Sequence, residues 1–147
     1  HKVIDCMKRL NKTAPRIALE YGLRGGTDVT GFGLLGHAME MAQASGVGLQ
    51  IENRNVPLTN GARKYAERGF FPGGAFDNKK YFGGNVKFNE AMDEPAQMLL
   101  YDPQTSGGLL LGVPPEKLEA FEERTQSLGQ AMWVIGSVVA GTGIEVR

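Results

Sequence analysis

A glycine-rich stretch near residue 30 contains the residues best suited to bind a charged ligand. It offers one carboxylate, two hydroxyls and two glycines: Thr27, Asp28, Thr30, Gly31 and Gly33. Glycine lets the backbone approach a ligand closely, and the first amides of the helix predicted after it favour negative charge. Because Asp28 would repel a phosphate, the set makes chemical sense when a hard cation lies between the two. Magnesium is bound in this way, by one or two carboxylates with phosphate oxygens and water, so the stretch predicts a magnesium–phosphate site.

The same residues also fit a purely structural role. Aspartate is common in turns and at helix N-termini, where its carboxylate accepts backbone hydrogen bonds. The spacing of Gly31 and Gly33 matches neither the Walker A loop nor the dinucleotide-binding fingerprint, and no Gly-Lys-Ser/Thr follows. On residue types alone, Asp28 is either a metal ligand or a turn residue.

Other polar residues are weaker candidates. We interpret His37 as a hydrogen-bonded structural group, since a catalytic histidine needs a positioned partner that the sequence does not identify. Asp102 and Thr105 are explained by an Asp-Pro turn. The cations that could approach phosphate are Arg63, Lys64 and Arg68 on a predicted surface helix, and Lys79 and Lys80 on a predicted loop. The loop lysines are the better candidates for an anion clamp, because charges on a surface helix are usually only solvated.

Length and composition favour one globular domain without nucleic-acid or membrane partners. The chain has 147 residues, 41% hydrophobic and 22% charged, with 16 basic and 16 acidic side chains. This balance shows no electrostatic footprint for nucleic acid. No apolar run reaches membrane-spanning length and no signal peptide is evident, so we expect a cytoplasmic protein. The chain opens directly into a helical pattern, which suggests that it continues a longer polypeptide.

Hydrophobic periodicity and turn residues predict an α+β fold, a mixed β-sheet packed with helices. Cys6, the one cysteine, shares the helical face of Val3 and Leu10 and is expected to be buried and inert. Residues 70–84 are predicted to form a long functional or mobile loop, and the final two strands to flank the turn at 141–143. The predicted helices are 1–12, 14–21 with Thr13 as N-cap, 34–45, 58–68, 95–100 and 114–128, and the predicted strands are 47–52, 109–111, 131–139 and 144–146.

Three blocks of the chain resemble the C-terminal domain of the selenophosphate synthetase (selenide, water dikinase) family, in order and in spacing. They are residues 27–37, residues 71–74 with Asn78, and residues 102–110. The first block has the sequence Thr-Asp-Val-Thr-Gly-Phe-Gly. This version resembles the motif of the selenium enzymes among the aminoimidazole ribonucleotide synthetase-like proteins. Thiamine-monophosphate kinase and a hydrogenase maturation factor of that superfamily carry other versions. The resemblance extends over essentially all 147 residues.

The resemblance implies an activity in which ATP, selenide and water give selenophosphate, AMP and phosphate, with Mg²⁺ required. It implies that Asp28 binds the metal and that the nucleotide is bound near Thr27, Thr30, Gly31 and Gly33. Residues 1–147 would form a single C-terminal domain. The family's reactive Cys or selenocysteine and its catalytic lysine belong to a preceding N-terminal domain, so no catalytic residue is assigned here. The expected partners are that domain, ATP and selenide, with a homodimer as the full-length protein and an inactive fragment alone.

Two departures from the family pattern bear on these expectations. Ala75 and Asp77 stand where relatives often carry Thr and Arg, which puts a phosphate contact from that loop in doubt. Tyr101 stands where Cys is frequent, a change expected to affect packing. Two alternatives stay open: a non-catalytic module that closes over nucleotide or receives selenium from a carrier, and the equivalent domain of another ATP-using enzyme of the superfamily.

Overall fold

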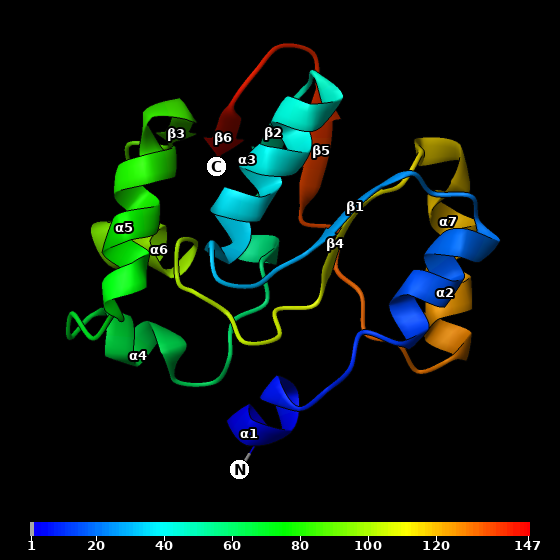
Figure 1. The fold of residues 1–147 in the computed structure, drawn as a ribbon, viewed down its shortest axis with the longest axis horizontal. Helices are drawn as coiled ribbons and strands as arrows, with labels where there is room; N and C mark the ends of the chain where they lie inside the picture. Colours follow the sequence, from blue (N-terminus) through cyan, green and yellow to red (C-terminus); the bar gives the residue numbers. More distant parts are fainter. Residues whose placement is uncertain (1) are drawn as a thin grey trace.

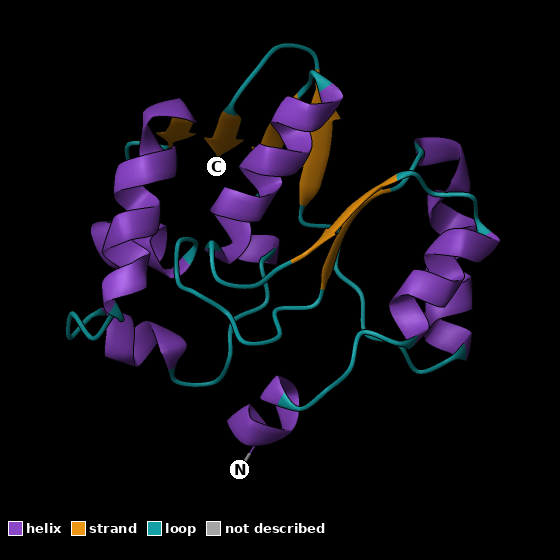
Figure 2. Ribbon diagram, in the orientation of Figure 1, coloured by secondary structure: helices purple, strands orange, loops and turns teal. Residues whose placement is uncertain are grey.

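The computed structural model describes residues 2–147, which form the helices and strands shown in Figures 1 and 2. The helices are α1 (Lys2–Met7), α2 (Thr13–Glu20), α3 (Gly33–Ser45), α4 (Ala62–Ala66), α5 (Gly73–Phe82), α6 (Glu94–Leu99) and α7 (Pro115–Ser127), with short 3₁₀ turns η1 (Asn53–Asn55) and η2 (Gly83–Asn85). The strands are β1 (Gly25–Asp28), β2 (Gly48–Ile51), β3 (Val86–Phe88), β4 (Leu109–Gly112), β5 (Gly136–Val139) and β6 (Ile144–Val146). Among these residues, no helix combines the length and the apolar character needed to cross a bilayer.

The larger sheet has the strand order β3-β6-β2-β5. Strand β6 runs parallel to both β2 and β3, whereas β5 runs antiparallel to β2. Strand β2 alternates apolar and polar residues, so Leu49 and Ile51 point to one face of the sheet. Helix α3 covers that face, and its Leu35 and Met39 join the two strand residues in the main core. The expected α+β fold with a mixed sheet is confirmed.

A second unit lies beside this core. Helices α2 and α7 pack together, with Tyr21 edge-to-face on Phe121 at 5.4 Å and an Arg124–Glu20 ion pair of 2.9 Å. The antiparallel ribbon of β1 and β4 connects this helix pair to α3 and the larger sheet. The ribbon therefore positions the segment that begins at Asp28.

The prediction of a loop over residues 70–84 is wrong, because α5 occupies most of it. The glycines and the Pro72-Gly73-Gly74 sequence only mark the beginning of the helix, at which Pro72 is the N-cap. Within the helix, Ala75, Asn78 and Phe82 are buried, and their spacing of three and four residues places them on one face. Burial of that face against the core stabilises a helix that the high glycine content conceals.

The strand predictions also need correction. Strand β5 begins at Gly136 rather than at residue 131, and β3 was not predicted. Strand β1 was not predicted, because two of its four residues are glycine and its pairing partner β4 is distant in sequence. The final strands β5 and β6 exist but do not form a hairpin, because β2 lies between them: Leu49 pairs with Val138 on one side and with Ile144 on the other.

The N-terminal helices differ from the prediction at their ends. Helix α1 ends at Met7 rather than near residue 12, and Thr13 lies inside α2, whose N-cap is Lys12. Cys6 is exposed, which corrects the expectation of burial. The reason is that α1 lies apart from the core, so its Ile4 remains 49% exposed. Helix α4 is likewise shorter than the predicted 58–68 segment.

Candidate functional site

Two of the three motif blocks, residues 27–37 and residues 102–110, meet where the β1–β4 ribbon ends. Asp28 pairs with Leu109 in the antiparallel register, and Val29 continues the ladder by donating its N–H to Gly108 O at 3.0 Å. Gly107 donates in return to Val29 O at 2.9 Å. A Cβ at Gly107 would lie 2.8 Å from Val29 O, so only glycine allows this approach. The fold therefore brings the residue 27–37 block against the residue 102–110 block.

The turn from β1 into α3 is held by backbone contacts. Thr30 O accepts hydrogen bonds from Gly33 N at 3.0 Å and from Gln104 N at 2.9 Å. Gly33 has φ +69°, and a Cβ there would lie 2.7 Å from the Tyr101 carbonyl carbon. Gly33 is thus required by the backbone conformation and by the close packing of the turn on Tyr101.

A buried amide on α5 fixes the same turn from the other side. The Asn78 Nδ2 group donates to Gly31 O and to Tyr101 O, both at 2.9 Å. Asn78 is 7% exposed, so water does not readily replace either bond. The sequence identified Asn78 only as part of a resembling block; its buried spacing with Ala75 and Phe82 is the signal that could have placed it.

Replacing Asn78 by Ala is expected to lower the free energy of unfolding by about 2–3 kcal/mol, because the buried Tyr101 carbonyl and the partly buried Gly31 carbonyl lose their donor. The matched control is Asn55→Ala, since the exposed Asn55 Nδ2 donates only to Val134 O at 3.1 Å. The control should change stability by no more than about 0.5 kcal/mol. Urea denaturation of the intact protein measures both values, and equal losses would contradict the assigned role of Asn78.

Asp28 is placed where a ligand can reach it. Along Asp28, Val29 and Thr30 the side chains are exposed, buried and half-buried in turn, as expected for an extended chain. The Asp28 and Thr30 side chains therefore lie on the side opposite Val29. Within residues 2–147, no group of three or more His, Cys, Asp or Glu side chains is arranged to hold a metal ion. Asp28 thus offers one hard oxygen ligand of the kind magnesium prefers, but not a complete cage.

His37, on the first turns of α3, is buried, with hydrogen bonds at one ring nitrogen and an ion-pair contact at the other. Its Nε2 lies 3.1 Å from Thr30 Oγ1 and 3.4 Å from Phe32 N, and its Nδ1 lies 3.3 Å from Glu40 Oε2. The Phe32 ring packs on the imidazole at a centroid distance of 5.2 Å. The expected hydrogen-bonded role is confirmed, and the bond with Thr30 connects His37 directly to a predicted site residue.

Three of the remaining candidates, Asp102, Lys79 and Arg63, form side-chain contacts of their own. Asp102 lies in the predicted turn; its burial raises the pKa of the carboxyl, and the hydrogen bond from Gln104 Nε2 at 3.0 Å opposes that rise. Lys79 forms an ion pair of 2.9 Å with Glu94, and Arg63 bonds the Asp93 carboxylate. Of the two lysines proposed as an anion clamp, Lys79 is therefore paired with Glu94, and no ion pair of Lys80 is found among the described residues.

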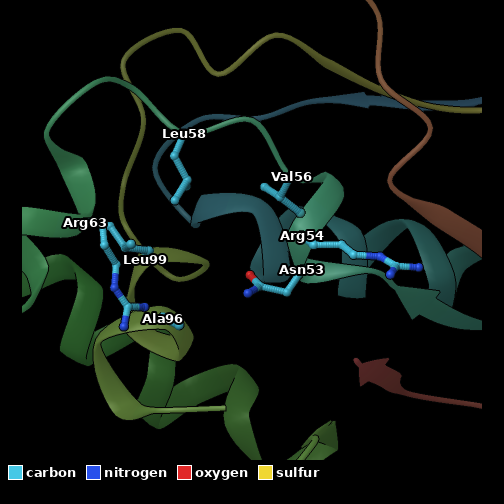
Figure 3. Close-up of a pocket in the computed structure, with 7 residues that line it drawn as sticks. All are labelled: Asn53, Arg54, Val56, Leu58, Arg63, Ala96 and Leu99. Carbon is cyan, nitrogen blue, oxygen red and sulfur yellow. The ribbon is translucent and has the colours of Figure 1, made fainter. Parts of the chain in front are cut away.

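A pocket of about 190 Å³ lies between η1, α4 and α6, and one of the candidate cations, Arg63, lines it. Figure 3 shows the Arg54 side chain extending away from the other lining residues. The pocket is lined by Asn53, Arg54, Val56, Leu58, Arg63, Ala96 and Leu99. None of these belongs to the predicted magnesium–phosphate set, so the pocket is separate from it.

Tyr101 occupies the core beneath the site and has an unpartnered hydroxyl. The side chain is fully buried, its Oη has no hydrogen-bond partner among the described residues, and its ring packs edge-on against Phe88 at 6.1 Å. Burial raises the pKa of Tyr101 to about 12. The folded protein therefore binds this proton more tightly than the unfolded chain, whose tyrosine titrates near pH 10.

Tyr101→Phe is expected to leave stability at pH 8 unchanged or higher by about 1 kcal/mol, because it removes a buried, unpaired polar group. Tyrosine contributes no pH dependence below pH 10. Between about pH 10 and 12 the unfolded chain loses the Tyr101 proton first, so the wild-type free energy of unfolding should fall more steeply than that of the variant. Urea denaturation from pH 8 to 12 measures the free energy of unfolding of both proteins. If the two values fall equally between pH 10 and 12, the raised pKa of Tyr101 is contradicted.

Comparison with known proteins identifies the family to which this chain belongs. Residues 5–147 match the family model of the AIR synthase related protein, C-terminal domain. The selenide, water dikinase of Caldanaerobacter subterraneus subsp. tengcongensis is 46% identical over 136 residues, which are 92% of this chain and 39% of that protein. Selenide, water dikinase 2 of Peptoclostridium acidaminophilum is 40% identical over 95% of this chain and 40% of its own length. The chain therefore spans about 40% of the length of these relatives.

Solved structures show the same fold. Thiamine-monophosphate kinase from Stenotrophomonas maltophilia K279a superposes with a TM-score of 0.58 at 16% identity, over 85% of this chain and 31% of that one. A structure of AaThiL complexed with AMPPCP and TMP superposes with a TM-score of 0.56 at 23% identity, over 89% of this chain and 32% of that one. At these identities the likeness concerns the fold alone.

Proposed function

The chain belongs to the family of AIR synthase related C-terminal domains, and from that premise we propose that it is the C-terminal domain of a selenophosphate synthetase. The complete protein would convert ATP, selenide and water to selenophosphate, AMP and phosphate. The observation that carries the proposal is the 46% identity to a selenide, water dikinase over 92% of the chain. The meeting of the two motif blocks at Asp28 supports it.

Within that protein, this domain would complete a magnesium–ATP site whose other ligands belong to the rest of the polypeptide. Mg²⁺ would neutralise charge that develops on the transferred phosphoryl group. Asp28 fits this ion because it is an exposed carboxylate, and Thr30 adds an oxygen on the same side of the chain. Thr27 and Gly31 are the remaining predicted nucleotide contacts in this turn.

The amides at the beginning of α3 are less available to phosphate than the motif suggests. Phe32 N donates to His37, Gly33 N donates to Thr30 O, and Leu35 N donates to Leu100 O at 3.1 Å. Gly33 would therefore support nucleotide binding through the conformation of the turn. This observation also favours a second candidate function, in which the domain closes over the nucleotide without holding the metal.

The full-length protein tests the proposed activity. With ATP, selenide and Mg²⁺ we expect ³¹P NMR to detect selenophosphate, AMP and phosphate, and no selenophosphate when selenide is omitted. Residues 1–147 alone should form none. Phosphorylation of thiamine monophosphate by the full-length protein without selenophosphate formation would instead assign it to another activity of the superfamily.

A further inference from the structure

We propose that His37 is a positioning residue that accepts the proton of the Thr30 hydroxyl, so that Thr30 presents only oxygen lone pairs beside Asp28. Such an oxygen suits the water shell of a cation rather than a phosphate oxygen. The inference rests on the proposed function and assigns Thr30 to the metal side of the site instead of the nucleotide side.

The hydrogen bonds around the imidazole determine where the protons lie. A backbone N–H can only donate, so Phe32 N, at 3.4 Å from His37 Nε2, requires that nitrogen to accept. On the other side of the ring, Nδ1 lies 3.3 Å from a Glu40 carboxylate oxygen, an ion-pair contact that favours a proton on that nitrogen. The Phe32 contact requires Nε2 without a proton, and the Glu40 carboxylate lies beside Nδ1, so together they place the ring proton on Nδ1. The Thr30 hydroxyl, 3.1 Å from Nε2, then donates its proton to the same lone pair, which it shares with the longer contact from Phe32 N.

The direction of this bond decides which ligand Thr30 can meet. A hydroxyl has one proton and two acceptor lone pairs, and the proton of Thr30 is already used inside the protein. Phosphate oxygens need donors, whereas the waters around Mg²⁺ are donors and need acceptors. Asp28 is an acceptor of the same kind, and the alternation at Val29 places both side chains on one side of the chain.

The surroundings keep this arrangement in place. The Phe32 ring packs on one side of the imidazole, and His37 is only 9% exposed. The Thr30 backbone is held through its carbonyl by Gly33 and Gln104. The hydroxyl therefore has little freedom to rotate away from His37 and donate to a bound phosphate.

The test measures metal and nucleotide affinity separately in the full-length protein. Mn²⁺ binding is followed by electron paramagnetic resonance with a saturating non-hydrolysable ATP analogue, and binding of that analogue is followed at saturating Mg²⁺. Thr30→Val and His37→Leu should each weaken Mn²⁺ binding about 10- to 100-fold, the usual effect of a residue that orients a metal's surroundings. Affinity for the analogue at saturating Mg²⁺ should change less than about twofold.

Two further variants separate positioning from folding. Thr30→Ser keeps the hydroxyl and His37→Gln keeps an acceptor, so both should retain most of the Mn²⁺ affinity.

The double variant Thr30→Val with His37→Leu should bind Mn²⁺ no more weakly than either single variant, because both substitutions act through the Thr30 oxygen. The matched control is Thr125→Val on α7, outside the turn at Asp28, which removes a buried threonine hydroxyl that donates to Glu122 O at 2.8 Å. The control should leave Mn²⁺ affinity unchanged.

The outcomes distinguish this inference from the proposed function. If Asp28→Asn weakens Mn²⁺ binding but Thr30→Val weakens only the nucleotide analogue, Thr30 is a phosphate donor and the inference is overturned while the function stands. If Asp28→Asn leaves Mn²⁺ binding unchanged, the proposed metal role itself fails. In ¹⁵N NMR spectra of the full-length protein, a proton on His37 Nε2 would also overturn the inference, and a proton on Nδ1 is expected.

Discussion

Replacing Asp28 by Asn in the full-length protein is expected to lower the rate of selenophosphate formation by more than about 100-fold, beyond the usual cost of changing a residue that only orients a metal ligand. Asparagine keeps the size of the side chain but loses the charge that attracts a hard cation. Single-turnover measurement of AMP formation at saturating Mg²⁺ and ATP reports the chemical step directly. Asp77→Asn, an exposed carboxylate on α5, is the matched control and should retain activity within about twofold.

The same measurement separates the two candidate functions of the domain. If the domain only closes over the nucleotide, Asp28→Asn should change the affinity for ATP and leave the single-turnover rate as in the wild type. Undiminished turnover at all concentrations would falsify any role of Asp28 in catalysis.

Gly33→Ala is expected to destabilise the protein by more than about 4 kcal/mol, a loss large enough to prevent folding of a marginally stable domain. Two costs add at this position. The left-handed backbone, at φ +69°, disfavours any side chain by about 1–2 kcal/mol. The new Cβ would also lie 2.7 Å from the Tyr101 carbonyl carbon and 2.8 Å from its oxygen, so the turn would have to move away from the segment that precedes Asp102.

Gly22→Ala separates these two costs. Gly22 has a similar φ of +64°, but a Cβ there would meet nothing within 4 Å. This variant should lose only the backbone cost of about 1–2 kcal/mol. Urea denaturation of the intact protein compares the two variants. Equal losses would show that close packing on Tyr101 adds nothing to the requirement for glycine at position 33.

Local patterns in the sequence were sufficient to predict the elements that are specified by signals within a few residues. The helix that ends at Gly46 is confirmed as α3, with Gly46 at φ +65°, and the alternation of Leu49 and Ile51 is confirmed as β2. The surface helix α7 and the short helix α6 also lie where periodicity placed them. These elements carry capping, turn and periodicity signals of their own.

Elements that depend on distant partners were missed or paired wrongly. Helix α5 was predicted as a loop because its glycines outweigh a buried face that exists only once Asn78 and Phe82 meet the core. Strand β1 needs β4 to form its ladder, and β2 inserts between β5 and β6. A strand's hydrogen bonds lie on another segment, so the pattern within one segment does not identify its neighbour.

The sequence by itself determined the family resemblance, the α+β class and the residue types of the magnesium–phosphate site proposed around Asp28. Only the tertiary structure decided that Asn78 and Gln104 hold this turn, and that the hydrogen bonds around His37 orient the proton of Thr30. The physical reason is that hydrogen-bond direction depends on all donors and acceptors around a group, and folding brings these together from segments far apart in the chain.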